Sequence, residues 1–233
     1  MSGRTFHVLE SCSITFPRHP HVLPTFRTTL PNCENVFYEG YPLWILSGVS
    51  VRKLTHLSVK CSASCKPRGD WELALFSSRA LQAGRLAPQI LHISIEATNS
   101  AWTKAFAYMS NLEELVIDNA RPSSIGVKAL RSLVVLSGIT SATGEWNKPQ
   151  CPSLKRFGLR YRRWLRPNEQ FDLIPVLISI IQSRQRSMFS LQSFRIWLSS
   201  DGDGPLELIE GSSESSEGFE RLKKYVAITG RNL

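Results

Sequence analysis

The sequence predicts an α/β fold built from irregular repeats, with short parallel strands on one face and helices and loops on the other. A short pattern, apolar-x-x-apolar-x-apolar, recurs along the chain, and most neighbouring copies begin 21 to 24 residues apart. Segments of helical character fill the longer intervals. Such a unit can bury its apolar residues only against its neighbours. The copies begin at Leu9, Cys33, Leu54, Ile90, Leu112, Leu133, Leu154 and Leu191.

The stretch MSNLEELVIDN, residues 109–119, has two interpretations. Its leucines and glutamates favour a helix that Asn111 would cap, whereas Val116 and Ile117 are β-branched and the final Asp-Asn pair is a turn signal. The spacing of the copies favours a strand, and matched copies constrain the structure more than the propensity of one window does. We therefore expect a strand whose two leucines and one isoleucine enter the core.

A small or polar pair precedes the first apolar residue of several copies, as in LPNC (30–33), MSNL (109–112) and CPSL (151–154). This rhythm resembles the leucine-rich repeats that follow the F-box in fungal F-box proteins, where CPxLxxLxL is typical. The segment CPSLKRFGL, residues 151–159, matches best. The resemblance spans residues 9–198 and implies a leucine-rich-repeat solenoid with degenerate repeats, since the asparagine typical of such repeats is missing.

The resemblance also implies a function. In F-box proteins such repeats recognise the substrates of cullin-type ubiquitin ligases, so we expect an intracellular, non-catalytic protein-interaction module. Residues 1–50 contain no F-box-like LPxEL start. A cullin-ligase adaptor is therefore expected as a partner only if an F-box lies outside this chain.

Three segments carry helix signals: residues 70–84, 123–133 and 167–185. The first has Asp70 as a candidate N-cap and Gly84 as a candidate C-cap, and the third contains Pro175 in its first turn or at a kink. We expect three parts in the chain. They are a repeat solenoid over residues 1–200, an acidic Gly/Ser/Glu flexible loop over 201–218, and a C-terminal helix over 219–233.

No motif of an enzyme, a cofactor site or a metal site is found in the sequence. It contains no P-loop, dinucleotide-binding glycine motif or nucleophile elbow. Cys61 and Cys65 lack the second Cys/His pair that a zinc site needs. Five cysteines, an odd number without a secretory signal, indicate reduced thiols and a cytoplasmic or nuclear protein. The apolar run at 173–181 is too short to cross a membrane.

If the apolar triplets point inward, the residues between them point outward and line one face of the sheet. Repeat proteins bind partners on such a face, and Arg and Trp are frequent hot-spot residues. The alternative is a solvated surface without specific use. The candidate partner-binding residues are His56, Ser58, Lys60, His92, Ser94, Glu96, Glu114, Val116, Asp118, Arg156, Arg160, Arg195 and Trp197.

The chain carries a net charge of +9, and residues 148–195 contain ten arginines and lysines against two acids. The run RYRRWLR at 160–166 interleaves arginine with aromatic residues, which suits phosphate binding and base stacking. Nucleic-acid binding through residues 155–166 is therefore the alternative function. An acidic protein segment or a solvated loop would also account for the run. Its basic patch consists of Arg162, Arg163, Trp164 and Arg166.

Overall fold

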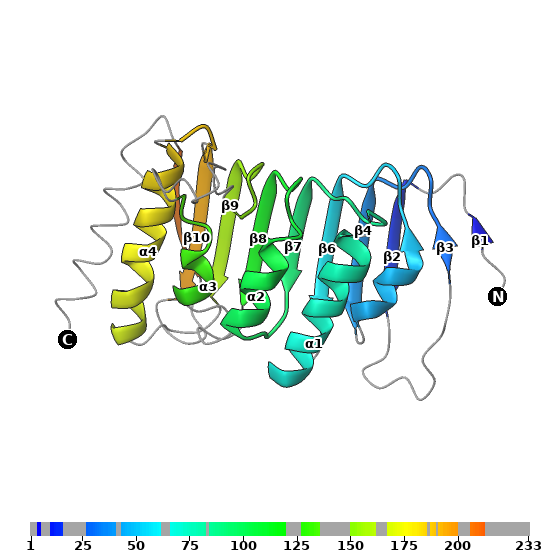
Figure 1. Ribbon diagram of the computed structural model, residues 1–233, viewed down its shortest axis with the longest axis horizontal. Coiled ribbons are helices and arrows are strands. Elements are labelled where there is room, and N and C mark those ends of the chain that lie inside the picture. Colours follow the sequence, from blue (N-terminus) through cyan, green and yellow to red (C-terminus); the bar gives the residue numbers. More distant parts are fainter. Residues whose placement is uncertain are drawn as a thin grey trace, which may run out of the picture.

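A computed structural model of the chain describes residues 4–5, 10–15, 27–40, 43–61, 66–82, 84–119, 127–135, 150–161, 167–185, 187–189, 191–199 and 206–212. Within these ranges the chain is an α/β protein with one large sheet and helices on one side of it (Figure 1). None of the helices in the described part of the chain is long and apolar enough to cross a membrane.

Seven parallel strands form the large sheet, and they lie side by side in chain order. They are β2 (Ser11–Thr15), β4 (Asn35–Gly40), β6 (His56–Cys61), β7 (Ile90–Ser94), β8 (Glu114–Asn119), β9 (Arg156–Tyr161) and β10 (Ser193–Ser199). β11 (Leu206–Ser212) pairs antiparallel with β10 and closes that edge. The short strands β1 (Arg4–Thr5), β3 (Thr28–Thr29) and β5 (Val49–Ser50) form a second parallel sheet.

The helices lie between successive strands in the sequence and on the same side of the sheet (Figure 1). They are the 3₁₀ helix η1 (Leu43–Gly48), α1 (Lys66–Phe76) with its π-helical continuation η2 (Ser77–Leu81), α2 (Asn99–Phe106), α3 (Val127–Arg131) and α4 (Pro167–Gln185). The strand and helix order confirms the predicted α/β class. α1 with η2, α3 and α4 overlap the three expected helical segments, whereas α2 was not expected.

One backbone contact repeats at the start of every strand from β4 to β10. A single carbonyl oxygen of the preceding strand segment accepts hydrogen bonds from two successive N–H groups. The accepting carbonyls belong to Glu10, Glu34, Thr55, Gln89, Glu113 and Lys155. The first paired residues of the seven strands, from β2 to β10, are Ser11, Asn35, His56, Ile90, Glu114, Arg156 and Ser193. This repeated contact fixes the register of all seven strands.

The motifs with a small or polar pair form tight turns before these contacts. The N–H of Cys33 bonds to the carbonyl of Leu30 at 3.4 Å, and the N–H of Leu154 bonds to the carbonyl of Cys151 at 3.1 Å. The same bond joins Met109 and Leu112 at 3.3 Å. All six side chains are buried. The turn lets two apolar residues three positions apart enter the core while the pair between them faces outward.

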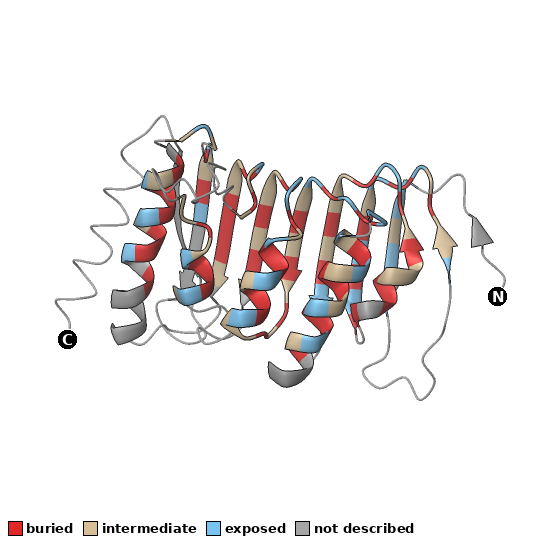
Figure 2. Cartoon of the chain, viewed as in Figure 1, coloured by how far each residue is buried: buried red, intermediate tan, exposed pale blue. Residues whose placement is uncertain are grey.

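Side chains alternate along each strand between the core and the opposite face, as Figure 2 shows by its bands of buried and less buried residues. The inward pairs include Leu115 with Ile117 in β8 and Phe157 with Leu159 in β9. The segment 109–119 is therefore a turn followed by a strand, which confirms the prediction made from repeat spacing. Its local helix propensity is overridden because the strand pairs on both sides and buries its apolar residues.

Two predicted repeat copies were wrong. Residues 133–135 form no strand, and β8 pairs directly with β9, so the copy at Leu133 is absent from the sheet. Leu133 instead ends a turn after α3, where its N–H bonds to the carbonyl of Leu130. The copy at Ile90 is shifted by two positions, because Leu91 and Ile93 are the residues in register with the inward pair of β6. Ile90 lies half-buried on the other face.

Asp70 does not cap its own helix, which begins four residues earlier at Lys66. Its carboxylate accepts hydrogen bonds from the backbone N–H of Thr98 and from Thr98 Oγ1, the latter at 2.8 Å. Thr98 is the N-cap of α2, and its Oγ1 also accepts from the N–H of Ala101 at 3.4 Å. Asp70 therefore ties α1 to the start of the next helix. Gly84, the expected C-cap, has a left-handed backbone with φ 66°.

The segment expected to be an acidic flexible loop, residues 201–218, contains the strand β11. Leu206, Leu208 and Ile209 give this stretch strand character, and pairing with β10 satisfies backbone groups that would otherwise form an open edge. Residues 213–233, which include the predicted C-terminal helix, lie outside the described residues, as do residues 162–166 of the basic run.

Arg184 of α4 is completely buried and joins the two sides of the longest strand connection. Its Nε donates to the carbonyl of Leu133 at 3.0 Å, and its two terminal nitrogens donate to the carbonyls of Gln150 at 2.6 Å and Cys151 at 3.2 Å. The planar guanidinium thus donates to one carbonyl in the segment after α3 and to two carbonyls in the segment before β9. A fork of donors suits this task better than a single ammonium would.

Replacing Arg184 with Met is expected to lower the free energy of unfolding by about 2 kcal/mol or more, because three carbonyls lose a charged donor. Arg184→Lys should recover only part of the loss. Arg131→Met, at an exposed arginine of α3, is the control and should change stability little. Urea denaturation of the three variants measures the effect, and equal midpoints for Arg184→Met and Arg131→Met would contradict it.

Gly69 allows α1 to pass against the chain after β7. A Cβ at this position would lie 1.5 Å from the carbonyl oxygen of Glu96. Gly69→Ala is therefore expected to force the helix away and to lower stability by about 1–3 kcal/mol. Ala74→Ser, at an exposed position of the same helix, should have little effect. Thermal melts of both variants followed by circular dichroism provide the test, and a wild-type melting temperature for Gly69→Ala would rule out the close approach.

Candidate functional site

The face of the sheet opposite the helices carries the candidate site, and we call it the open face. Register arranges its outward residues in rows that cross the strands. The middle row runs through Phe37, Ser58, His92, Val116, Gly158 and Arg195. A second row runs through Asn35, His56, Ile90, Glu114, Arg156 and Ser193. Residues far apart in the sequence therefore become neighbours on one surface.

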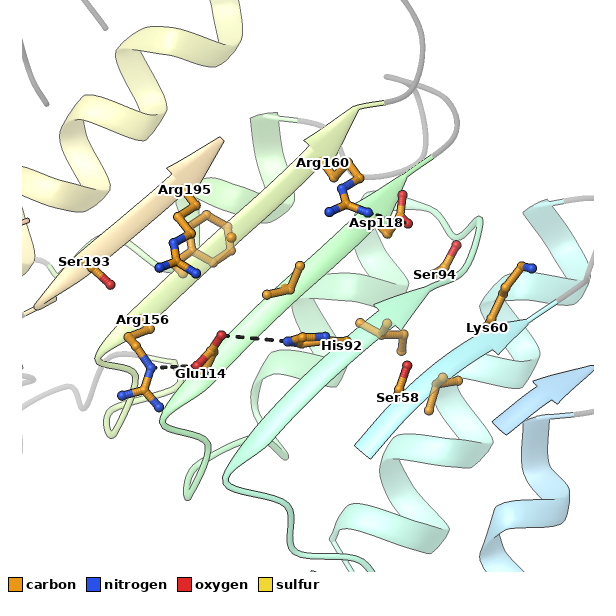
Figure 3. Close-up of a pocket in the computed structure, with 15 residues that line it drawn as sticks. Ser58, Lys60, His92, Ser94, Glu114, Asp118, Arg156, Arg160, Ser193 and Arg195 are labelled. Atoms are coloured by element: carbon orange, nitrogen blue, oxygen red, sulfur yellow. Dashed lines mark hydrogen bonds and ion pairs between the residues drawn. The ribbon is translucent and has the colours of Figure 1, made fainter. Parts of the chain in front are cut away.

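A depression of about 360 Å³ lies in the open face across β6 to β10 (Figure 3). Ten predicted partner-binding residues line it: Ser58, Lys60, His92, Ser94, Glu114, Val116, Asp118, Arg156, Arg160 and Arg195. Gly158 in the middle row and Ser193 complete the outward lining. His56 lies next to the depression, and Glu96 follows β7 outside it. The side chain of Trp197 and the basic patch Arg162, Arg163, Trp164 and Arg166 lie outside the described residues.

Glu114 of β8 stands between side chains of both neighbouring strands. Its Oε2 accepts a 2.6 Å hydrogen bond from Nε of Arg156 in β9, and its Oε1 lies 3.8 Å from Nε2 of His92 in β7 (Figure 3). The Arg156 contact is a short charge-assisted hydrogen bond, whereas the His92 distance is too long for one. Glu114 therefore holds the Arg156 guanidinium in place over the sheet.

Two further ion pairs join neighbouring strands in a third row of the open face, which contains Glu39, Lys60, Asp118 and Arg160. Nη1 of Arg160 lies 3.8 Å from Oδ2 of Asp118, and Nζ of Lys60 lies 2.6 Å from Oε1 of Glu39. The Lys60 pair is well exposed, with side chains 62% and 56% accessible, so it contributes little to stability and exchanges readily with a competing anion. The depression itself contains four cationic side chains and two carboxylates.

An aromatic group borders the depression on β4, β6 and β7. The ring of Phe37, which is 44% exposed, lies 5.9 Å from that of His56, and the His56 ring meets the His92 ring edge-on at 4.7 Å. Burial and the neighbouring His56 lower the pKa of His92, Arg160 acts in the same direction, and Glu114 opposes them. His92 is therefore neutral at pH 7.

Phe37 and Ile90 also lie on the open face, although neither was expected there. Phe37 belongs to the repeat copy that begins at Cys33. Applying the same in-out alternation to that copy would have identified Phe37 as an outward residue. Ile90 was assigned to the core, and only the strand register places it outward.

Metal ligation and thiol reactivity depend on the placement and burial of side chains in the described residues. They contain no group of three or more His, Cys, Asp or Glu side chains placed to hold a metal ion. Burial raises the pKa of the Cys151 thiol to about 12 and also raises the pKa of the Cys33 thiol. Thiols of this kind are unreactive, because the thiolate is the nucleophile. The chemistry of the open face is that of hydrogen bonding, ion pairing and aromatic contact.

Comparison of this chain with protein-family models, with curated proteins and with solved structures finds no match.

Acidification should destabilise the protein through His92. Its pKa is lower in the folded state than its ordinary value of 6.5, so the unfolded chain binds a proton first as the pH falls. The stability that depends on a neutral His92 ring is fully present above pH 6.5 and is lost as the pH falls below that value and through the lower pKa of the folded state. Urea midpoints of the wild type should therefore drop more between pH 7.5 and 5.5 than those of His92→Gln. Parallel pH dependences for the two proteins would contradict this assignment.

Proposed function

We propose that the chain is a non-catalytic protein-interaction module, a degenerate leucine-rich-repeat solenoid that binds a protein partner with its open face. The observation that carries the proposal is the depression, to which five successive strands contribute charged or polar side chains on the side free of helices. Surfaces rich in arginine and aromatic side chains are typical of protein recognition.

Three features support the solenoid interpretation. The parallel strands follow chain order, every connecting helix lies on the same side, and a second set of short parallel strands runs through β1, β3 and β5. An isolated bridge from Val51 to Leu86 extends that second set by one more turn of the chain. Stacked repeats of this kind bury a continuous core and present one extended surface.

The resemblance of the repeats to those of F-box proteins leads to a more specific role. In that role the open face selects targets for a cullin-type ubiquitin ligase, and an adaptor for the ligase binds through an F-box outside this chain. The protein acts in the cytoplasm or nucleus and needs no cofactor.

Nucleic-acid binding through residues 155–166 is the second candidate, and the geometry favours it less. Lys155 lies 3.2 Å from Glu113, and Arg156 and Arg160 also face carboxylates. These carboxylates cancel part of the positive charge on which sequence-independent phosphate binding depends, whereas a ligand that binds through Arg156 needs only the terminal nitrogens that do not bond to Glu114.

Affinity capture with tagged full-length chain, read by mass spectrometry, tests the proposal. A double variant of the open face, Arg156→Ala with Arg195→Ala, should lose partners that the wild type retains. A matched double variant of the helical face, Lys128→Ala with Arg131→Ala, should retain them.

The proposal fails if partner recovery is the same for the wild type and the open-face variant, or if both double variants lose partners equally. Recovery of the cullin adaptor together with targets would support the ligase role. Targets that depend on the open face but come without the adaptor would leave the interaction module standing. The ligase role is removed if the adaptor is also absent when the chain is captured together with the F-box sequence expected outside it.

A further inference from the structure

The chemistry of the open face narrows the kind of partner it fits. The depression contains Lys60, Arg156, Arg160 and Arg195 against Glu114 and Asp118, so its net charge is +2 with His92 neutral. A positive concave surface attracts an anionic ligand and raises its association rate. The partner segment should therefore carry carboxylates.

Arg156 has the geometry to bind such a carboxylate. Only its Nε donates to Glu114, at 2.6 Å, so among the described residues its two terminal NH₂ groups are left for a ligand. Figure 3 shows these nitrogens directed away from Glu114, at the edge of the depression. Two parallel N–H donors match the two oxygens of a carboxylate. Glu114 thus acts as a positioning residue for Arg156.

The aromatic group at the other side of the depression fits an apolar or aromatic side chain. Phe37 is one of few large apolar side chains that the described residues expose, and the rings of His56 and His92 extend its surface toward the depression. Aromatic pairs add stabilisation beyond that of the area they bury. An aromatic side chain of the partner would stack here, while acidic residues reach the arginines.

Strand spacing sets the length of the segment. The step from β4, which carries Phe37, to β10, which carries Arg195, crosses five strand intervals. At about 4.8 Å per interval the span is about 24 Å. An extended peptide covers this distance with about seven residues.

We propose that the open face binds an extended peptide of about seven residues from a partner protein, with an aromatic residue over Phe37 and carboxylates over Arg156, Arg160 and Arg195. This inference rests on the proposed interaction function and specifies its ligand. Gly158 in the middle row leaves the space between Val116 and Arg195 into which the peptide fits.

Fluorescence polarisation with the full chain tests the proposal. The probe is a fluorescein-labelled heptapeptide, Trp-Glu-Gly-Glu-Glu-Gly-Glu, and the control probe has Gln in place of each Glu. The acidic peptide should bind at low salt, and the control should bind at least about tenfold more weakly, since each lost charged contact of about 1.4 kcal/mol is a factor of ten.

Four variants locate the site. Arg156→Gln should weaken binding about tenfold by removing a bidentate partner. Glu114→Gln keeps a side-chain oxygen that can accept from Nε of Arg156 and removes only the repelling charge. It should therefore strengthen binding about threefold, and a folding defect cannot produce such a gain. Gly158→Leu should abolish binding by filling the depression. Lys128→Gln, on the helical side, should leave it unchanged.

Phe37→Ala tests the aromatic contact, because it should weaken the tryptophan peptide but not a version with Gly in place of Trp. An oligouridylate of seven nucleotides is the competing ligand. The proposal is overturned if the Glu and Gln peptides bind alike, if Glu114→Gln weakens binding, or if the oligouridylate binds more tightly through the same arginines. If affinity capture yields partners that need the open face but acidic peptides do not bind, this inference fails and the interaction module stands.

Discussion

One hydrogen-bond arrangement, repeated at each strand start, determines the geometry of the whole molecule. A carbonyl such as that of Glu113 accepts from the N–H groups of two successive residues, Lys155 and Arg156, and the same contact recurs from Glu10 to Lys155. This contact aligns each strand with the one before it. A shift of one residue would exchange the buried and outward faces of a strand, so apolar burial and strand register support each other.

The connections between strands vary in length, and specific side chains accommodate the long ones. Between β6 and β7 the chain forms α1 and η2, and Gly69 lets this helix lie against the backbone of Glu96. Between β8 and β9 it forms α3, and Arg184 binds carbonyls at both sides of that connection. Regular sheet pairing is thus compatible with irregular repeats, because close contacts and a buried arginine hold the longer connections to the core.

The open face follows from the same register. Glu114 and Arg156 are 42 residues apart in sequence, and they meet because their strands pair at these two positions. Arg160 meets Asp118 in the same way two rows further along the strands, beyond the middle row. Charges that lie in separate repeats become a network in which each carboxylate orients a cation. The strands that carry this surface are held by hydrogen bonds to their neighbours, so its side chains have fixed relative positions.

The sequence alone determined the in-out alternation of the strands, the turns before them and the α/β class, because these depend on residues within a few positions of one another. MSNL at 109–112 and CPSL at 151–154 show this well, since their spacing of apolar residues specifies the turn locally. Two local patterns led to wrong predictions, because a pattern of nearby residues does not specify which strand positions pair. Leu91, Ile93 and Ile95 alternate and are all apolar, so the pattern cannot choose between two registers that differ by two positions. Leu133 ends a turn like the others, but residues 133–135 form no strand.

Only the tertiary structure decided which strands are neighbours and which outward residues meet. Pairing of β8 with β9 removes the copy at Leu133, brings Arg156 to Glu114 and places Gly158 in the lining of the depression. These contacts depend on hydrogen bonds between segments far apart in the chain, and no local propensity encodes them. The sequence thus determined which residues face outward, and the register of the sheet decided how they combine into a surface.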